Sequence, residues 1–178
     1  MRQGSPVGPD NPSSDAGLER LDAEAVVKRY QDVWYRFTLS VLCQEDLAMD
    51  ATQETALRVI EGLEGFGGRS SVRTWSLGIA LNVCREMSRK RRRWRWVPLV
   101  DRAGEASEPS ALERAEEVAQ LRRVLKGLSE RQREAVSLRY FESLSVAETA
   151  VAMGCSVGTV KALVHQAIAA ARRDWGQR

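Results

Sequence analysis

The stretch SVAETAVAMGCSVGTVK, residues 145–161, decides the fold of the C-terminal part of the chain. Counted from Val146, it places Ala150 at position five, Gly154 at position nine and Val160 at position fifteen. A small residue lets two helices cross closely, the glycine takes a left-handed turn without a Cβ clash, and the apolar residue packs under the first helix. These are the steric requirements of a helix-turn-helix, which we expect over 146–153 and 157–174.

A helix-turn-helix places the N-terminal end of its second helix in the major groove of DNA. The exposed candidates for such contact are Ser156, Thr159, Lys161 and Ala162. The simpler interpretation is a helical hairpin without a ligand. All three steric positions match beside a basic segment, however, and this combination favours DNA binding.

The neighbouring sequence is helical as well. Two capping boxes, Ser129-x-x-Gln132 and Ser145-x-x-Glu148, each open a helix, and the first of these helices carries Val136, Leu138 and Tyr140. A further helix is expected near 112–126. In the N-terminal half, a helical period runs from Leu18 to Val41.

A second N-terminal helix is expected over 45–63, with Leu47, Ala51, Leu57, Ile60 and Leu63 as its apolar members. Glycines between 62 and 68 then end this helix, and Phe66 is the apolar residue among them. Ser70 and Ser71 are candidate caps for a third helix over 72–92, whose apolar face carries Trp75, Ile79, Val83 and Met87. No strand with sustained alternation is found, so the sequence predicts an all-α fold of two small helical domains.

We expect the domain boundaries to follow composition. Residues 1–17 predict a disordered tail, and residues 18–96 a first helical domain. Residues 97–111 predict a flexible linker because they contain proline, glycine and acidic residues without a helical period. Residues 112–178 predict the second domain.

Composition excludes several classes of protein. The chain has 178 residues, of which 43% are hydrophobic and 29% charged, with a net charge of +3. No apolar run approaches the ~18 residues of a membrane span, and the N-terminus lacks the apolar core of a signal peptide. Cys43, Cys84 and Cys155 are scattered and odd in number, which favours a reducing, cytoplasmic location over a disulfide framework. We expect no metal or cofactor.

Charge is arranged in blocks along the chain. Residues 45–64 carry a net charge of −5, residues 69–95 carry +8, and residues 119–178 carry +5. The first basic block ends in a run that continues a helix, so its charges are held in place. The run is interleaved with Trp94 and Trp96, whose rings are candidates to stack on bases or to pack on the domain. Nucleic-acid contact is favoured for this run over a purely solubilising role, because cations displace the counterions of phosphates.

Taken together, these segments resemble a bacterial RNA polymerase sigma factor of the sigma-70 family, in its extracytoplasmic-function (ECF) group. The matching stretches include Asp50-Ala-Thr-Gln53-Glu54-Thr, Phe66-Gly-Gly-Arg69, Val72-Arg73-Thr74-Trp75 and Ile79-Ala80-Leu81-Asn82. In the second half they include Leu128-Ser-Glu-Arg131-Gln132-Arg133-Glu134 and Ser156-Val-Gly158-Thr159-Val160-Lys161. The resemblance covers most of the chain.

The resemblance implies a transcription initiation factor, not an enzyme, with three contact surfaces. Similar proteins dock an acidic helix on the β′ clamp helices of core polymerase and also contact the β flap. The matching docking residues are Asp46, Asp50, Gln53 and Glu54. The candidate contacts to the −10 promoter element are Arg69, Ser70, Arg73, Thr74, Asn82, Arg85, Arg89, Lys90, Arg92 and Arg93, while Trp75 is expected in the core.

The resemblance also implies that the helix-turn-helix reads the −35 element. Its candidate contacts are Ser156, Thr159, Lys161, Ala162 and His165. Many similar proteins are held inactive by an anti-sigma factor, and whether this chain has such a partner is left open.

The chain departs from the family pattern at a few positions. Leu81 stands where similar proteins usually have arginine, and Thr149 replaces a typically aliphatic residue. In the recognition helix, Leu163 and Gln166 also stand where similar proteins usually have arginine, and the loss of these two cations predicts weaker phosphate anchoring at −35. An alternative function is a two-domain helix-turn-helix regulator that acts without core polymerase, but such a protein has no evident use for the acidic helix face at 45–64. A nucleic-acid-cleaving enzyme is weaker still, because no paired carboxylates with metal-ligand spacing accompany the basic segments.

Overall fold

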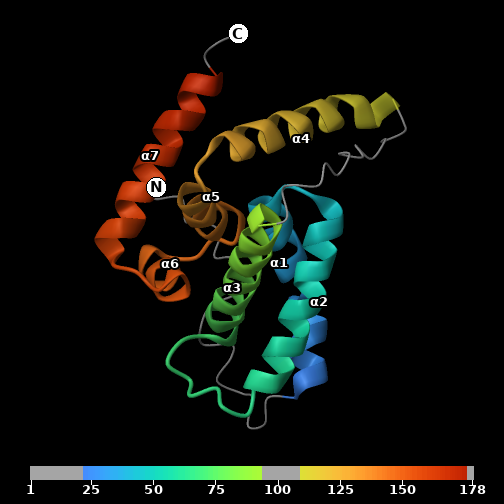
Figure 1. The fold of residues 1–178 in the computed structure, drawn as a ribbon, viewed down its shortest axis with the longest axis vertical. Helices are drawn as coiled ribbons and strands as arrows, with labels where there is room; N and C mark the ends of the chain where they lie inside the picture. The colour runs from blue at the N-terminus through green and yellow to red at the C-terminus, as the bar shows by residue number, and fades with distance from the viewer. Residues whose placement is uncertain (1–21, 94–108, 176–178) are drawn as a thin grey trace, which may run out of the picture.

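The computed structural model describes residues 22–93 and 109–175. In chain order they form α1 (Ala23–Leu42), α2 (Glu45–Gly62), α3 (Val72–Arg93), α4 (Pro109–Gly127), α5 (Glu130–Val136), the π-helical segment η2 (Ser137–Phe141), α6 (Val146–Met153) and α7 (Val157–Trp175). No strand occurs in these two ranges, and the all-α prediction is confirmed. We refer to α1–α3 as the first module and to α4–α7 as the second module (Figure 1).

The first module is a three-helix bundle built around large side chains of α1. Trp34 and Phe37 are fully buried and pack with Leu77 of α3. The indole nitrogen of Trp34 donates a hydrogen bond of 3.0 Å to the buried hydroxyl of Ser76, so this polar group is satisfied inside the core. Asp22 caps the start of α1 by accepting from the backbone nitrogen of Glu24. The bundle therefore fixes α3 against α1 and α2.

The second module contains the predicted helix-turn-helix. Both capping boxes are present, at Ser129 and Ser145. Gly154 ends α6 in the left-handed conformation, with φ 62°, while Ala150 and Val160 are buried as the steric pattern requires. Among the described helices, none alone is long and apolar enough to cross a membrane, and α6 with α7 passes that test only as a pair bent by 101°.

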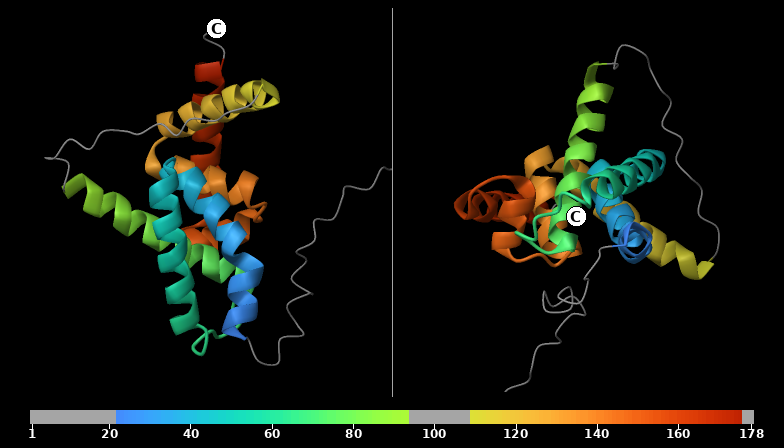
Figure 2. Two further views of the ribbon diagram at one scale, coloured as in Figure 1. Left: turned by 90° about the vertical axis from the view of Figure 1, so that its right-hand side faces the viewer. Right: turned by 90° about the horizontal axis from the view of Figure 1, so that it is seen from below.

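The two modules pack directly against each other. α6 of the second module lies on α3 of the first, as Figures 1 and 2 show. The segment η2 packs on α1. One continuous apolar core includes Leu77 and Cys84 of the first module together with Leu138 and Val160 of the second. Cys43, which follows α1, packs in a second cluster with Leu125, Leu128 and Ala167. The two modules are thus joined by extensive apolar contacts.

The structure differs from the sequence predictions in a few details. Leu57 and Ile60, two of the expected apolar members of α2, are exposed at 57% and 44%, because Ala48, Ala51, Thr55 and Val59 form the buried face of this helix. The helix after Ser129 changes to π-helical geometry at Ser137, which turns Tyr140 to the surface. α4 begins at Pro109, three residues before the predicted start.

Several predictions concern residues that the structure does not describe. The predicted tail over 1–17 lies outside the described residues, as do Trp94, Trp96 and all of the predicted 97–111 linker except its last three residues, which begin α4.

Candidate nucleic-acid interface

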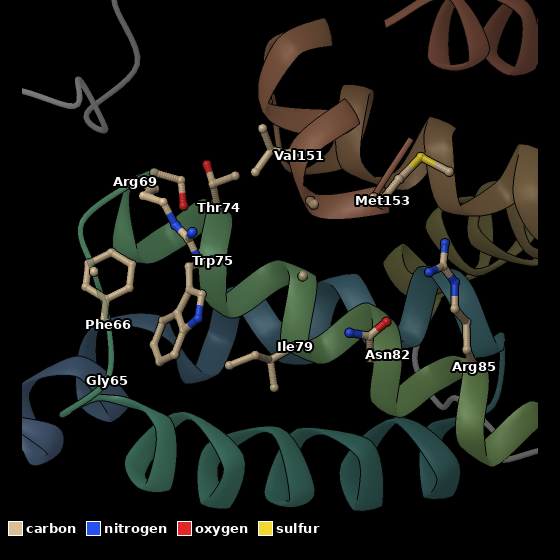
Figure 3. Close-up of a pocket in the computed structure, with 15 residues that line it drawn as sticks. Gly65, Phe66, Arg69, Thr74, Trp75, Ile79, Asn82, Arg85, Val151 and Met153 are labelled. Carbon is tan, nitrogen blue, oxygen red and sulfur yellow. The ribbon is translucent and has the colours of Figure 1, made fainter. Parts of the chain in front are cut away.

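A pocket of about 590 Å³ lies where the Gly-rich loop meets α3. Phe66 of the loop packs on Trp75 with ring centroids 4.9 Å apart, and these rings form one end of the pocket. Ile79 and Asn82 continue the wall along α3, while Val151 and Met153 of α6 line the opposite side (Figure 3). Trp75, expected in the core, is half-buried at the pocket edge. The pocket is therefore lined by two aromatic rings, Phe66 and Trp75, and by the side-chain amide of Asn82.

Two arginines beside this pocket are held by carboxylates of the second module. Arg85 forms a bidentate pair with Glu134, with Nε–Oε1 and Nη2–Oε2 distances of 2.9 and 2.7 Å. Arg73 donates from Nη1 to the carbonyl oxygen of Glu142 at 2.7 Å and from Nη2 to its carboxylate at 3.1 Å. The pKa of the Arg85 guanidinium is raised, first of all by its hydrogen bonds to Glu134. Both cations are therefore engaged within the chain.

The remaining −10 candidates divide by exposure. Thr74 is fully buried, and its hydroxyl accepts a hydrogen bond from Ser71 at 3.0 Å, while Ser70 is half-buried. Arg92 forms an exposed pair with Glu130 of α5 at 2.7 Å. The side chains that lie open to solvent along the loop and α3 are Arg69, Asn82, Arg89, Lys90 and Arg93. These exposed groups form a basic surface that continues beyond the pocket.

Glu148 adds a further carboxylate to the contact between the modules. Burial acts to raise its pKa, but hydrogen bonds from Ser145, with smaller contributions from the Arg73 charge and the Thr74 hydroxyl, lower the pKa below its ordinary value. Arg73 is thus faced by two acidic residues of the second module.

The candidate polymerase-docking residues lie on the outer face of α2. Asp46, Asp50 and Gln53 are exposed, and three apolar side chains share their side of the helix: Met49, Leu57 and Ile60, which are 53%, 57% and 44% exposed. We did not predict this apolar stripe from the sequence. Met49 follows Asp46 by three residues and Leu57 follows Gln53 by four, which places them on the same side of the helix. This spacing is the sequence signal that could have predicted the stripe.

Glu54 has a different environment from the other docking candidates. Its carboxylate accepts a hydrogen bond of 2.7 Å from Nε of Arg58, and the same guanidinium forms a bidentate pair with Glu86 of α3. Hydrogen bonds from Arg58 lower the pKa of Glu86. The hydrogen bonds of Arg58 therefore connect α2 to α3 and hold the carboxylate of Glu54 next to the Arg58 guanidinium.

The candidate −35 residues lie along the exposed side of α7. Ser156 caps this helix by accepting from the backbone nitrogen of Thr159 at 3.1 Å, and the two hydroxyls are 2.9 Å apart. Lys161, Ala162 and His165 follow on the helix surface and are exposed. Packing of the two modules therefore leaves the recognition helix open.

The positions that depart from the family pattern have structural reasons in part. Leu81 is fully buried in the shared core, and Leu163 packs against that core, so both side chains are turned away from solvent. Gln166 is exposed and accepts a hydrogen bond from Gln132. Thr149 is buried, and its hydroxyl donates to the carbonyl of Ser145 at 2.8 Å, so an aliphatic site accommodates it without an unpaired polar group.

The cysteines are structural in character. Cys43 and Cys84 are buried, and burial raises the pKa of the Cys84 thiol to about 12, so it is protonated at neutral pH. In the ranges 22–93 and 109–175, no three side chains of His, Cys, Asp or Glu are grouped to hold a metal ion.

Comparison with known proteins identifies the family. A model of sigma-70 region 2 matches residues 26–94, and a model of sigma-70 region 4 matches residues 119–170. The chain is 36% identical over 152 residues to the ECF RNA polymerase sigma factor SigC of Mycobacterium tuberculosis, which covers 81% of this chain and 78% of that protein. It is 30% identical over 160 residues to the RNA polymerase sigma-E factor of Streptomyces avermitilis, covering 90% and 88%.

Solved structures show the same fold. The sigma factor RpoE of Bartonella quintana, solved in complex with the anti-sigma factor NepR, matches with a TM-score of 0.74 at 23% identity, over 87% of this chain and 98% of that one. CnrH, solved with the cytosolic domain of CnrY, matches with a TM-score of 0.66 at 21% identity, over 91% and 92%. These findings do not favour a regulator that acts without polymerase, and the chain belongs to the ECF sigma factors of the sigma-70 family of transcription initiation factors.

Proposed function

We propose that this chain binds core RNA polymerase and directs it to a class of promoters by contacts at the −10 and −35 elements. The observation that carries the proposal is the presence, on one chain of this family, of an exposed recognition helix and of a separate acidic and apolar face on α2. A repressor that only binds DNA needs the first of these surfaces and has no use for the second.

The docking surface is assigned to the outer face of α2. Asp50 and Gln53 supply polar contacts, and Met49 and Leu57 supply apolar area at the centre of the contact. Interfaces of this kind draw most of their affinity from buried apolar anchors, while rim charges set orientation and the rate of encounter. The β′ clamp helices of core polymerase are the proposed partner.

The first module is assigned to the −10 element and the second to the −35 element, with domain boundaries at 18–96 and 112–178. A base taken out of the stack needs a pocket with stacking surfaces, and Phe66, Trp75 and Asn82 supply such a surface. The −35 DNA stays duplex, so Lys161 and its neighbours on α7 act in the major groove. The second module also carries the proposed contact to the β flap.

The remaining assignments follow from the role of a dissociable subunit. The chain carries out no chemistry of its own, because polymerase makes the transcript, and it acts in the cytoplasm without a metal or cofactor. The sigma factor RpoE, which has the same fold, was solved with an anti-sigma factor, so an anti-sigma factor is a candidate partner here as well.

Co-purification with core polymerase tests the docking surface. Asp50→Arg reverses a charge in the middle of the α2 face, and we expect it to lower the recovered polymerase at least tenfold without loss of helical content. Asp32→Arg on α1 makes the same charge change at an exposed site outside this face and serves as the matched control. Equal recovery with both variants would remove α2 from the proposal.

A further inference from the structure

Glu86 is the single acidic residue in a strongly basic segment of the sequence. Residues 69–95 contain nine basic side chains and this one carboxylate. Glu86 lies on α3 with its side chain 46% exposed. A negative charge on a surface assigned to DNA repels phosphate, so the segment would bind DNA more strongly without it. General affinity for DNA therefore does not account for a carboxylate at this position.

Glu86 also lines a hollow of about 350 Å³ between α2 and α3. The lining of the hollow includes Arg58 of α2 together with Asn82 and Arg89 of α3. Asn82 precedes Glu86 by four residues, so the two side chains share one face of α3. Because Asn82 lines the larger pocket of the Gly-rich loop as well, the hollow lies next to the proposed base pocket.

The guanidinium of Arg58 fixes the carboxylate of Glu86. Arg58 donates from Nη1 to Oε1 at 2.9 Å and from Nη2 to Oε2 at 2.7 Å, and its Nε is held in turn by Glu54. The hydrogen bonds from Arg58 lower the pKa of Glu86, and the charge of Arg89 adds to this effect, so Glu86 is ionised at neutral pH. A side chain that is already held in place loses little rotamer freedom when it binds a ligand.

The ion pair leaves acceptor capacity on Glu86. An ionised carboxylate has about four lone-pair sites on its two oxygens, and Arg58 uses one site on each oxygen. The remaining sites accept hydrogen bonds from donors, which a DNA base presents as an exocyclic amino group. Among contacts to base edges, carboxylates accept from N4 of cytosine, whereas amides pair with adenine and arginines with guanine.

The simpler explanation is that the ion pair only connects α2 to α3. Exposed ion pairs contribute little to stability, and the Arg58 and Glu86 side chains are 35% and 46% exposed. α2 and α3 also share an apolar core that includes Val59 and Leu77. The ion pair therefore adds little to the contact between these helices, and a role in recognition is favoured.

We propose that Glu86 is a specificity-determining residue, which selects cytosine at one position of the −10 element by accepting a hydrogen bond from N4 of the base. This inference rests on the proposed function of the first module and deepens it. Arg58 is a positioning residue, since it holds the carboxylate and does not touch the base. Guanine and thymine present a carbonyl oxygen to the carboxylate and are rejected, while adenine, which has an amino group, ranks between them and cytosine.

The spacing along α3 predicts which position Glu86 reads. Four residues of an α-helix rise about 6 Å, and successive nucleotides of one stacked strand are about 3.4 Å apart. The position that depends on Glu86 should therefore lie one or two nucleotides from the position that depends on Asn82.

Run-off transcription with core polymerase and the full-length chain tests this assignment. The templates have a randomised −10 region and carry a barcode in the transcribed part, so sequencing of the transcripts gives the base preference at each position. The unchanged chain should favour cytosine over guanine at least about fivefold at the position that Glu86 reads. Glu86→Gln keeps the shape and removes the charge, and it should lower this preference at least about fivefold and shift it towards adenine. Asn82→Ala identifies the neighbouring position.

Two further variants separate recognition from structure. Arg58→Met removes the positioning residue but leaves the carboxylate, so the preference at the same position should fall about two- to fivefold while other positions stay unchanged. Glu24→Gln removes an exposed charge from α1 and should leave every base preference unchanged. A carboxylate that only connects two helices changes no single position, because its loss lowers transcription from all templates alike. Circular dichroism checks the helical content of every variant.

The outcomes distinguish this inference from the proposed function. If folded Glu86→Gln alters no single position of the −10 element, Glu86 reads no base and the inference is overturned, while the proposed function stands. If the position that Glu86→Gln alters favours a base other than cytosine in the unchanged chain, the inference is overturned as well. If the unchanged chain selects no promoters at all, the proposed function is overturned, and the inference falls with it.

Discussion

Gly154→Ala is expected to destabilise the helix-turn-helix through the backbone alone. Gly154 has φ 62° and ψ 44°, and its amide donates to the carbonyl of Val151 at 3.2 Å. A Cβ at this position would meet nothing within 4 Å, so no steric clash with the rest of the protein adds to the effect. A residue with a Cβ in this left-handed conformation costs about 1–2 kcal/mol.

Gly158→Ala is the matched control, four residues further on. Gly158 lies in the first turn of α7, where a Cβ would be 3.7 Å from the Ser156 hydroxyl, an ordinary contact. An alanine in a helix is favoured over glycine by about 0.5–1 kcal/mol, so this change should stabilise the chain. Gly154→Asn should lose less than Gly154→Ala, because asparagine tolerates the left-handed region.

Thermal unfolding followed by circular dichroism measures all three variants. For a chain of this size each kcal/mol corresponds to about 2–4 °C, so Gly154→Ala should lower the Tm by about 2–8 °C while Gly158→Ala raises it. Equal Tm values for the two alanine variants, or a higher Tm for Gly154→Ala, would refute the assignment of Gly154 as the residue that the turn requires.

Three further outcomes are expected. Ser76→Ala leaves the buried Trp34 indole nitrogen without its acceptor and should lower the free energy of unfolding in urea by about 1–3 kcal/mol; an unchanged midpoint would contradict this. Hydrogen bonds from Arg58 lower the pKa of Glu86 in the folded chain below its ordinary value of 4.5. The ion pair between Glu86 and Arg58 therefore contributes its full stabilisation above about pH 4.5, and this contribution is lost as the pH falls through the folded pKa. In Glu86→Gln, the free energy of unfolding should consequently fall less steeply with decreasing pH in this range. Lys161→Ala should weaken duplex DNA binding and reduce the salt slope by about one, and an unchanged slope would place this lysine outside the interface.

Local sequence signals predicted the second module well. Capping boxes, a left-handed glycine and the small and apolar residues at Ala150 and Val160 act within a few residues of one another, so their effect does not depend on the rest of the fold. The same holds for the start of α3, where the backbone nitrogen of Thr74 donates to Ser71 as the cap prediction required. These features can be derived from short-range sterics and hydrogen bonds.

Long-range packing set the features that could not be predicted. Leu57 and Ile60 have helical spacing, but the face that turns inward was decided by the small residues that fit against α1 and α3. In the sequence, nothing distinguishes Glu134 and Glu142 from charged residues on a protein surface. Contact between the modules buries their side chains against Arg85 and Arg73. A local sequence pattern cannot predict that the arginines of α3 will contact glutamates of the second module, because these residues are far apart in the sequence.

Run-off transcription on a promoter library measures whether this chain gives core RNA polymerase its promoter specificity. Core polymerase with the purified chain should produce transcripts from a subset of templates that share two short elements. Polymerase alone, or with the Asp50→Arg variant, should not produce them. Transcripts that are the same with and without the chain would contradict the account.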